Sequence, residues 1–197
     1  MKKIAVLVAI VVVIVCAVGG WFFWRFVMSD QAKVTHHVQE IKKIWLNNNV
    51  FLDGILESNR QFASLGDADM RALDKEWQEE GTSGKYNLID KVASNNVSKY
   101  IQGILARSNG LYSEIIVMNN KGMTVGAYPI TSDYWQGDEA KWQKTFLKGN
   151  GAVFIDKAKF DDSIEGYQSQ VSFTVTNPAD GKPIGAISVG INLTKLK

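Results

Sequence analysis

The pattern of apolar and polar positions divides this chain near its start. Residues 4–24 contain no charged side chain, whereas apolar and polar positions alternate throughout the sequence after Arg25. An uncharged apolar run of about 20 residues is long enough to cross the hydrocarbon core of a bilayer as a helix. Lys2 and Lys3 precede the run, so the positive-inside rule predicts a cytoplasmic N-terminus. We therefore expect residues 1–28 to form one transmembrane anchor, with the remaining chain on the far side.

Two alternatives remain open for this segment. A cleaved signal peptide has an apolar region of only about 7–15 residues and a small-residue cleavage site, and residues 17–19 offer such a site. The aromatic residues 21–24 that follow are more typical of an aromatic belt at the membrane interface. A lipoprotein would use Cys16, but Val15 occupies the preceding position, where a small residue is required.

Residues 29–65 have the spacing of a long stalk and dimerisation helix. Residues 33–65 contain no proline, and Gly54 is their only glycine. Side chains at heptad-like intervals are Val34, Val38, Ile41, Trp45, Asn48, Leu52, Ile55, Asn59 and Phe62. Two hypotheses fit this pattern. The helix either packs on its own domain, or continues the anchor and also pairs with a partner helix, the two asparagines then fixing the register of a homodimer.

The remaining sequence predicts shorter helices followed by strands. Apolar positions at helical spacing indicate helices over residues 67–79 and 88–105, the first capped by Asp67 or Asp69. After residue 111 the period becomes two, which is typical of strands. Strands are expected at residues 112–118, 123–128, 152–156, 167–176 and 184–191, with a helix at 137–147. This order predicts an α+β fold in which an antiparallel sheet has the long helix behind it.

Composition excludes several classes of function. The formal net charge is only +2 with no basic cluster, so we expect no nucleic-acid partner. Cys16 is the only cysteine, which excludes disulfides and cysteine-ligated zinc from the rest of the chain. The only histidines, His36 and His37, are adjacent and would point about 100° apart on a helix, so we interpret both as solvated surface rather than metal ligands.

Catalytic chemistry also lacks its usual residues. No histidine follows residue 37, and no nucleophile-elbow or phosphate-loop spacing occurs. We therefore expect no enzyme activity, no cofactor and no metal. Hydrolysis by paired carboxylates remains a distant alternative.

Three segments of the second half resemble a known family. They are IIVMNNKG at residues 115–122, TSDYWQGDE at 131–139 followed by Trp142, and GAISVGI at 185–191. These segments are similar to the Cache (PDC-type, PAS-like) extracytoplasmic sensor domains of bacterial and archaeal receptors, and the second segment is the most specific. A long helix after a membrane anchor also matches the layout of that family. The resemblance implies one Cache-like sensor domain over residues 66–197 that binds a small molecule.

The sequence departs from this family at its C-terminal end. Most such sensors return through a second membrane helix to a cytoplasmic output module, whereas this sequence stops at Lys197. We therefore expect a single-pass protein of the inner membrane, with its domain in the periplasm or extracytoplasmic space, that signals through a separate transducer. The alternative is a ligand-free structural or assembly subunit of a membrane complex.

The resemblance also implies where the ligand binds, between the open sheet face and the segments that cross it. The residues so implicated are Tyr128, Ser132, Asp133, Tyr134, Trp135, Trp142, Phe154, Asp161, Tyr167 and Ser169. Asp133 is the leading candidate because it lies among aromatic residues rather than at a helix cap. Simpler roles remain open for Trp142 as a core side chain and for Asp161 in a solvated loop.

The charges of this region bear on the ligand. No arginine occurs after Arg107, so the bidentate guanidinium clamp typical of carboxylate binding is missing from the second half. Aromatic and acidic residues together are typical of sites for ammonium-type cations. The sequence thus favours an amine or a neutral polar ligand over a dicarboxylate.

Overall fold

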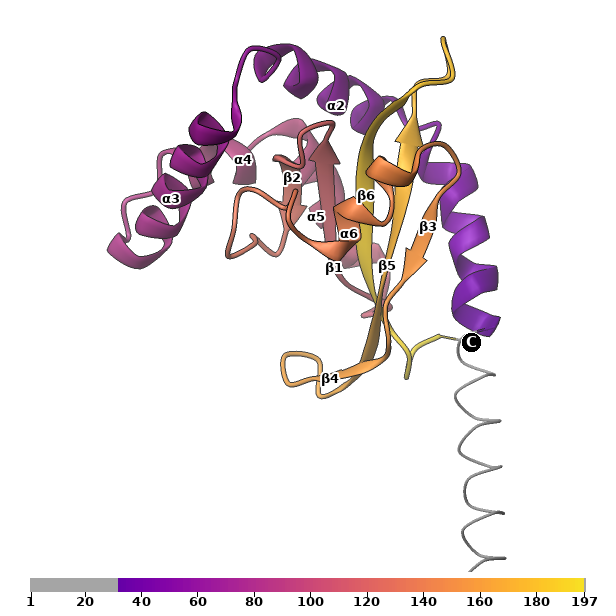
Figure 1. Ribbon diagram of the computed structural model, residues 1–197. Helices are drawn as coiled ribbons and strands as arrows, with labels where there is room; N and C mark the ends of the chain where they lie inside the picture. Colours follow the sequence, from indigo (N-terminus) through magenta and orange to yellow (C-terminus); the bar gives the residue numbers. More distant parts are fainter. Residues whose placement is uncertain (1–31, 197) are drawn as a thin grey trace, which may run out of the picture.

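The computed structural model describes residues 32–196, and the predicted anchor at residues 1–28 lies outside them (Figure 1). Within the described range, no helix is long and apolar enough to cross a bilayer. The elements are a helix over residues 32–45, α2 (Asn49–Gln61), α3 (Asp67–Ser83), α4 (Leu88–Ala93), α5 (Asn96–Arg107), β1 (Tyr112–Asn119), β2 (Thr124–Tyr128), α6 (Ala140–Gln143), the 3-10 helix η1 (Phe146–Lys148), β3 (Val153–Ile155), β4 (Lys159–Asp161), β5 (Gly166–Thr176) and β6 (Pro183–Asn192).

The strands form one antiparallel sheet, as the sequence predicted. Its order is β2-β1-β6-β5-β3, and β4 pairs with the other end of β5. The helix over residues 32–45, α2 and α5 lie behind the sheet, whereas α6 and η1 lie in front of it (Figure 1). The α+β class is therefore confirmed.

The main core lies between the sheet and the helices behind it. Val171 pairs with Val189 and Phe173 with Ile187 across β5 and β6, and all four side chains are fully buried. They belong to one cluster with apolar side chains of the helix over residues 32–45 and of α2. Burying each such side chain contributes about 1.5–3 kcal/mol, so this layer supplies much of the stability.

The helix predicted over residues 29–65 is interrupted before residue 49, and α2 ends at Gln61. Asn48 caps α2, because its Oδ1 accepts hydrogen bonds from the backbone N–H of Val50 at 3.0 Å and of Phe51 at 3.4 Å. Its Nδ2 also donates to the hydroxyl of Tyr100 at 2.9 Å. The second asparagine of the heptad pattern, Asn59, donates to the carbonyl of Ile184 at 2.8 Å. Both asparagines of the heptad pattern therefore form hydrogen bonds within their own chain.

The apolar positions of the same pattern are also used internally. Val34, Val38, Ile41 and Trp45 are buried in the core cluster that includes the sheet. This confirms the hypothesis that the helix packs on its own domain. A homodimer stays a prediction, and it would need a surface other than this row of side chains.

Three further elements differ from the prediction. The helix expected over residues 88–105 is split into α4 and α5, because Asn95 caps α5 by accepting from the N–H of Ser98 at 2.9 Å. The helix expected over residues 137–147 is reduced to α6 and η1. Residues 157–166, which separate two of the expected strands, contain the additional strand β4, which pairs with β5 from Lys159↔Gln168 to Asp161↔Gly166.

The histidines also differ from each other. His36 is exposed, as predicted, whereas His37 is half-buried with its Nε2 at 3.0 Å from the hydroxyl of Tyr112. Burial, and secondarily the charge of His36, lower the pKa of His37. The interpretation of His37 as solvated surface was therefore wrong, since it helps to hold its helix on β1.

Candidate ligand-binding site

The two faces of the β5–β6 hairpin have opposite chemistry. The face toward the helices carries valine, isoleucine and phenylalanine, whereas the face in front carries small and polar side chains. We call the latter set the polar face. It consists of Glu114 on β1, Gln168, Gln170, Ser172 and Thr174 on β5, and Ser188 on β6. Antiparallel register places these residues on one side, because directly opposite residues point to the same face.

The upper part of the polar face is buried yet hydroxyl-rich. Ser172 and Ser188 form a hydrogen bond between their hydroxyls at 2.9 Å. Thr174 is 1% exposed, and its Oγ1 has no hydrogen-bond partner among the described residues. Leaving a buried hydroxyl unpaired costs about 1–3 kcal/mol. This hydroxyl is therefore an unpaired polar group that the fold encloses.

The lower part of the polar face contains two carboxylates held by glutamines. Gln170 Nε2 donates to Glu114 at 2.7 Å. Gln168 accepts from the hydroxyl of Ser113 at 2.5 Å and donates to Asp161. Hydrogen bonds from the side chain and backbone of Ser163 lower the pKa of Asp161, which therefore stays anionic. Neither Glu114 nor Asp161 forms a salt bridge within residues 32–196.

α6 and η1 cover part of this face, where they lie against β5 and β6. Trp142 is buried against Ile116, Met118 and two alanines. Its indole N–H donates to the carbonyl of Asn119 at 3.1 Å. Its ring also stacks on Phe146 with centroids 5.1 Å apart. Trp142 thus has the packing of a core residue, the simpler of its two expected roles.

Some residues from the sequence-based set border the polar face. Phe154 pairs with Ser172 in register and so shares its face, and the ammonium group of Lys144 lies 4.3 Å from the Phe154 ring centroid. Asp161 contacts the polar face through Gln168. Trp142 packs beside it. The structure brings these three predicted residues to one side of the sheet.

Three other predicted residues lie elsewhere. Tyr128 pairs with Ile115, so it lies on the helix side of the sheet. Ser169 pairs with Ile191 on that same side, and its hydroxyl donates to the carbonyl of Asp156 at 2.8 Å. Tyr167 is 56% exposed.

The predicted residues of the loop after β2 are held by α3, at the β2 edge of the sheet (Figure 1). Asp74 Oδ1 accepts from the backbone N–H of Tyr134 at 2.7 Å and of Trp135 at 2.9 Å. Asp133 accepts from Gln78 Nε2 at 2.9 Å, and from the hydroxyl of Ser132 at 2.6 Å. The aromatic and acidic side chains of this loop therefore anchor it to a helix, and they do not converge with Phe154 and Asp161.

Sequence reasoning missed Ser172, Thr174, Ser188 and the two glutamines. The signal was present in the strict alternation of residues 168–175, where Gln, Gln, Ser and Thr alternate with Ser, Val, Phe and Val. Two-residue periodicity assigns such polar residues to one face. Within residues 32–196, no group of three or more His, Cys, Asp or Glu side chains is placed to hold a metal ion.

Comparison with solved structures returns ligand-binding domains of chemoreceptors and the sensor domain of a histidine kinase, all at low sequence identity. The Campylobacter jejuni chemoreceptor Tlp3 domain in complex with 4-methylisoleucine is 18% identical with a TM-score of 0.38, over 76% of this chain and 63% of that one. The V. cholerae histidine kinase DctB sensor domain is 10% identical with a TM-score of 0.37, over 88% and 58%. The Pseudomonas fluorescens chemoreceptor CtaA domain in complex with L-serine is 12% identical with a TM-score of 0.37, over 66% and 60%. This chain thus spans about three-fifths of the length of these structures.

No protein-family model and no curated protein matches the sequence.

Proposed function

We propose that this chain is a membrane-anchored extracytoplasmic domain that binds a small polar molecule on the polar face and signals through a separate partner protein. The observation that carries the proposal is the buried hydroxyl row of Ser172, Thr174 and Ser188, which includes the unpartnered Oγ1 of Thr174. Valine or alanine at these positions would pack a strand core without the cost of burying polar groups. A polar lining instead supplies hydrogen-bond partners to a bound solute.

The chemistry of the polar face favours an amine or neutral polar ligand. The carboxylates of Glu114 and Asp161 lie at its lower part without a cationic partner among the described residues. An ammonium group would be attracted to them, and the hydroxyls above would bond to polar groups of the same molecule. A dicarboxylate would meet like charge at this end.

The arrangement of the sheet offers a route from the ligand to the membrane. Ser172 faces the proposed ligand, and the next residue, Phe173, lies on the opposite face with its ring centroid 6.4 Å from that of Trp45. Trp45 ends the helix over residues 32–45, which follows the predicted anchor in sequence. A shift of β5 on ligand binding would therefore act on this helix through one packed contact.

The test uses the full chain in detergent micelles. Its thermal unfolding is measured with a panel of small amines, amino acids, purines, polyols and dicarboxylates. Thr174→Val removes the unpartnered hydroxyl at nearly constant shape, so it should keep or raise the unfolding temperature of the free protein while reducing the shift caused by the ligand. Asp180→Asn, in the exposed β5–β6 turn, is the matched control and should change neither. If no compound stabilises the chain, the structural or assembly subunit becomes the better hypothesis.

A further inference from the structure

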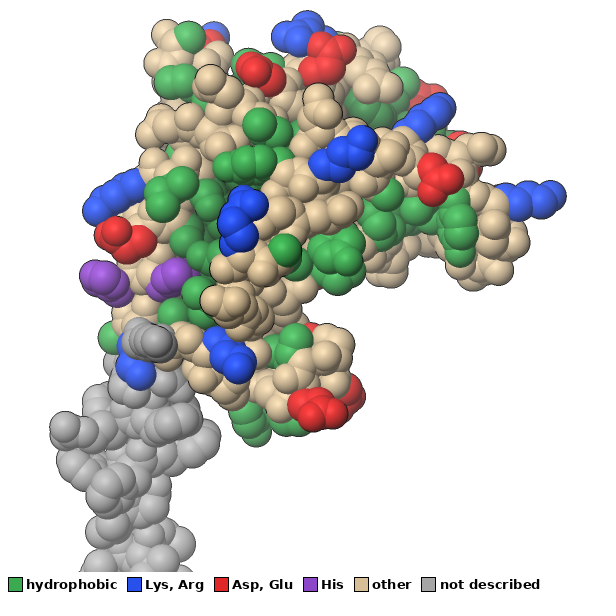
Figure 2. All heavy atoms as spheres, turned by 180° about the vertical axis from the view of Figure 1, so that it is seen from behind, with side chains coloured by type: hydrophobic (Ala, Val, Ile, Leu, Met, Phe, Trp, Pro, Cys, Tyr) green, Lys and Arg blue, Asp and Glu red, His purple; other side chains and the backbone are tan. Residues whose placement is uncertain are grey.

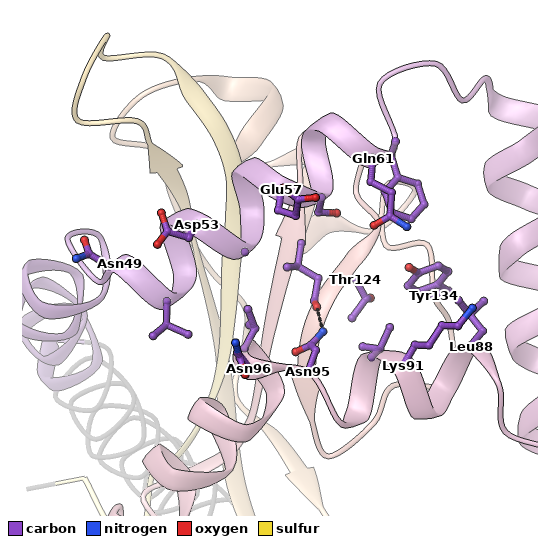
Figure 3. Close-up of a pocket in the computed structure, with 17 residues that line it drawn as sticks. Asn49, Asp53, Glu57, Gln61, Leu88, Lys91, Asn95, Asn96, Thr124 and Tyr134 are labelled. Carbon is purple, nitrogen blue, oxygen red and sulfur yellow. Dashed lines mark hydrogen bonds between the residues drawn. The ribbon is translucent and has the colours of Figure 1, made fainter.

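A cavity lies on the helix side of the sheet. α2 forms one wall, and α4 and the start of α5 form the other, with β2 beneath them (Figure 3). Its volume is about 640 Å³, which is within the range of small-molecule sites, about 300–1,000 Å³. We call this cavity the helix-side groove. It shares no residue with the polar face.

The α2 wall of the groove is acidic and polar. Asp53, Glu57 and Gln61 line it at intervals of four residues, which places them on one face of the helix. Glu57 is bonded to Arg60, whereas Asp53 forms no salt bridge or side-chain hydrogen bond within the described part of the chain. Lys91 on α4 lines the facing wall (Figure 3). Because Arg60 neutralises Glu57, Asp53 is the one unpaired carboxylate among the described residues that line the groove.

The floor of the groove contains the only other unpartnered buried side-chain hydroxyl of residues 32–196. Thr124 is 2% exposed, and its Oγ1 has no hydrogen-bond partner. Neighbouring polar groups of the lining are satisfied, since Ser58 accepts from Asn119 Nδ2 at 3.0 Å and Asn95 donates to the carbonyl of Val125 at 2.8 Å. The free hydroxyl lies between Asn95 and Tyr134 in Figure 3. It is enclosed beneath the lining, so a molecule in the groove would bond to it once the side chains that cover it shift.

Tyr134 adds a second hydroxyl to the floor. Its ring is fixed by stacking on Trp77, and its hydroxyl points into the groove (Figure 3). Burial raises the pKa of Tyr134 to about 12, so the hydroxyl stays protonated and can donate at neutral pH. Apolar side chains of Phe62, Leu88 and Val92 line the space around it.

The surface around the groove carries no dominant charge. Seen from behind, basic and acidic side chains are interspersed, with hydrophobic side chains reaching the surface between them (Figure 2). Such a surface gives no long-range attraction for a polyanion or a polycation. Recognition would depend on the groups inside the groove.

We infer that the helix-side groove is a second binding site, for a small amino alcohol. Its ammonium group would bond to Asp53 at the rim, its aliphatic body would pack on Val97 and Val125, which lie against α2 at Gly54, and its hydroxyl would bond to Thr124. This inference does not depend on the proposed function, because the groove and the polar face lie on opposite sides of the sheet.

The test is calorimetric titration of the full chain in detergent micelles with 5-amino-1-pentanol. Pentylamine and 1,5-pentanediol, which lack one of the two polar groups, are the comparison probes. We expect 5-amino-1-pentanol to bind more tightly than either. Thr124→Val should weaken its binding about 5- to 10-fold, the effect of losing one hydrogen bond. Asp53→Asn should weaken it by about 10-fold, because the ammonium loses a charged partner.

Two controls separate the groove from the polar face. Glu76→Gln, on the exposed surface of α3, should leave the dissociation constant unchanged. Thr174→Val should also leave it unchanged. Equal binding by wild type and Thr124→Val would overturn the inference, and so would the absence of binding at millimolar concentration. Sensitivity to Thr174→Val alone would assign the amino alcohol to the polar face and would equally overturn it. Thr124→Val replaces an unpaired buried hydroxyl by a methyl group, so its unfolding temperature should match or exceed that of wild type.

Discussion

The indole of Trp77 on α3 stacks on the phenol ring of Tyr134, with ring centroids 4.9 Å apart and planes 4° from parallel. The indole N–H also donates to the carbonyl of Thr131 at 2.9 Å. This one side chain therefore contacts the loop after β2 through both its face and its edge. Phe62 from α2 meets the same tyrosine ring edge-on at 6.3 Å. α2, α3 and the loop thus share one aromatic cluster.

Trp77→Ala should remove this cluster and destabilise the domain. Trp77 is 1% exposed, so its truncation leaves a large cavity and should cost about 3–5 kcal/mol of unfolding free energy. Hydrogen exchange should accelerate in residues 131–137, and denaturant unfolding should give the free-energy loss. Gln78→Ala is the control, because it removes only an exposed hydrogen bond to Asp133. A loss no greater than that of the control would contradict the role of the stack.

Asp74 and Asp133 should have different effects when changed. Asp74 Oδ1 accepts two backbone N–H groups of the loop, so Asp74→Ala should destabilise it by about 1.5–3 kcal/mol. Asp133 bonds at the surface to Gln78 and Ser132. Asp133→Asn should therefore keep the fold, and the dissociation constant of a polar-face ligand should stay within about 2-fold of the wild-type value. Urea unfolding and ligand titration measure the two effects. A large loss of binding in Asp133→Asn with the fold intact would restore the sequence-based assignment of Asp133 as a ligand contact.

The strands were predictable because their signal is local. The expected strand at residues 184–191 corresponds to β6 (Pro183–Asn192), and that at 112–118 to β1 (Tyr112–Asn119). In β6, β-branched residues alternate with small or polar ones, whereas β1 contains a continuous apolar run rich in β-branched residues, and turn residues mark the ends of both. The helix breaks were not predictable in this way, since the apolar spacing continues across Asn48 and Asn95. There the side-chain oxygen bonds to backbone N–H groups, and the choice between a cap and a helix interior depends on tertiary contacts.

The candidate site was only partly predictable, because a strand residue belongs to the site only if its side chain lies on the polar face of the sheet. Phe154 and Asp161 border the polar face, whereas Ser169, within the same predicted strand–loop–strand region, faces the helices. A shift of one residue in register exchanges the two faces. The aromatic residues of the loop after β2 were also predicted to contact the ligand, whereas in the structure they anchor this loop to α3. The small hydroxyl residues of β5 and β6 carry a weaker compositional signal but form the buried polar row.

Asn48→Ala should destabilise the start of α2. The substitution removes the N-cap and the hydrogen bond to Tyr100, for an expected loss of about 1–2 kcal/mol. Asn48→Asp keeps an accepting cap but loses the donor to Tyr100, so its loss should be smaller. Asn47→Ala, one residue earlier and exposed, is the control. Thermal unfolding ranks the variants, and sedimentation measures the oligomeric state. A change of oligomeric state without loss of stability would favour the register role that the heptad pattern suggested.

Acidification should weaken the docking of the helix over residues 32–45. Burial, and then the charge of His36, lower the pKa of His37 in the folded state below its unfolded value of about 6.5. The folded chain therefore binds fewer protons in this window than the unfolded chain, so the contribution of His37 is present above pH 6.5 or so and is lost as pH falls through the folded pKa. Unfolding temperatures of the full chain in detergent micelles should fall from pH 7.5 to 5.5 more steeply in wild type than in His37→Phe, which cannot be protonated. Hydrogen exchange at residues 32–45 should show the same difference. Parallel pH profiles for the two proteins would mean that the contact between His37 and the Tyr112 hydroxyl does not hold the helix on β1.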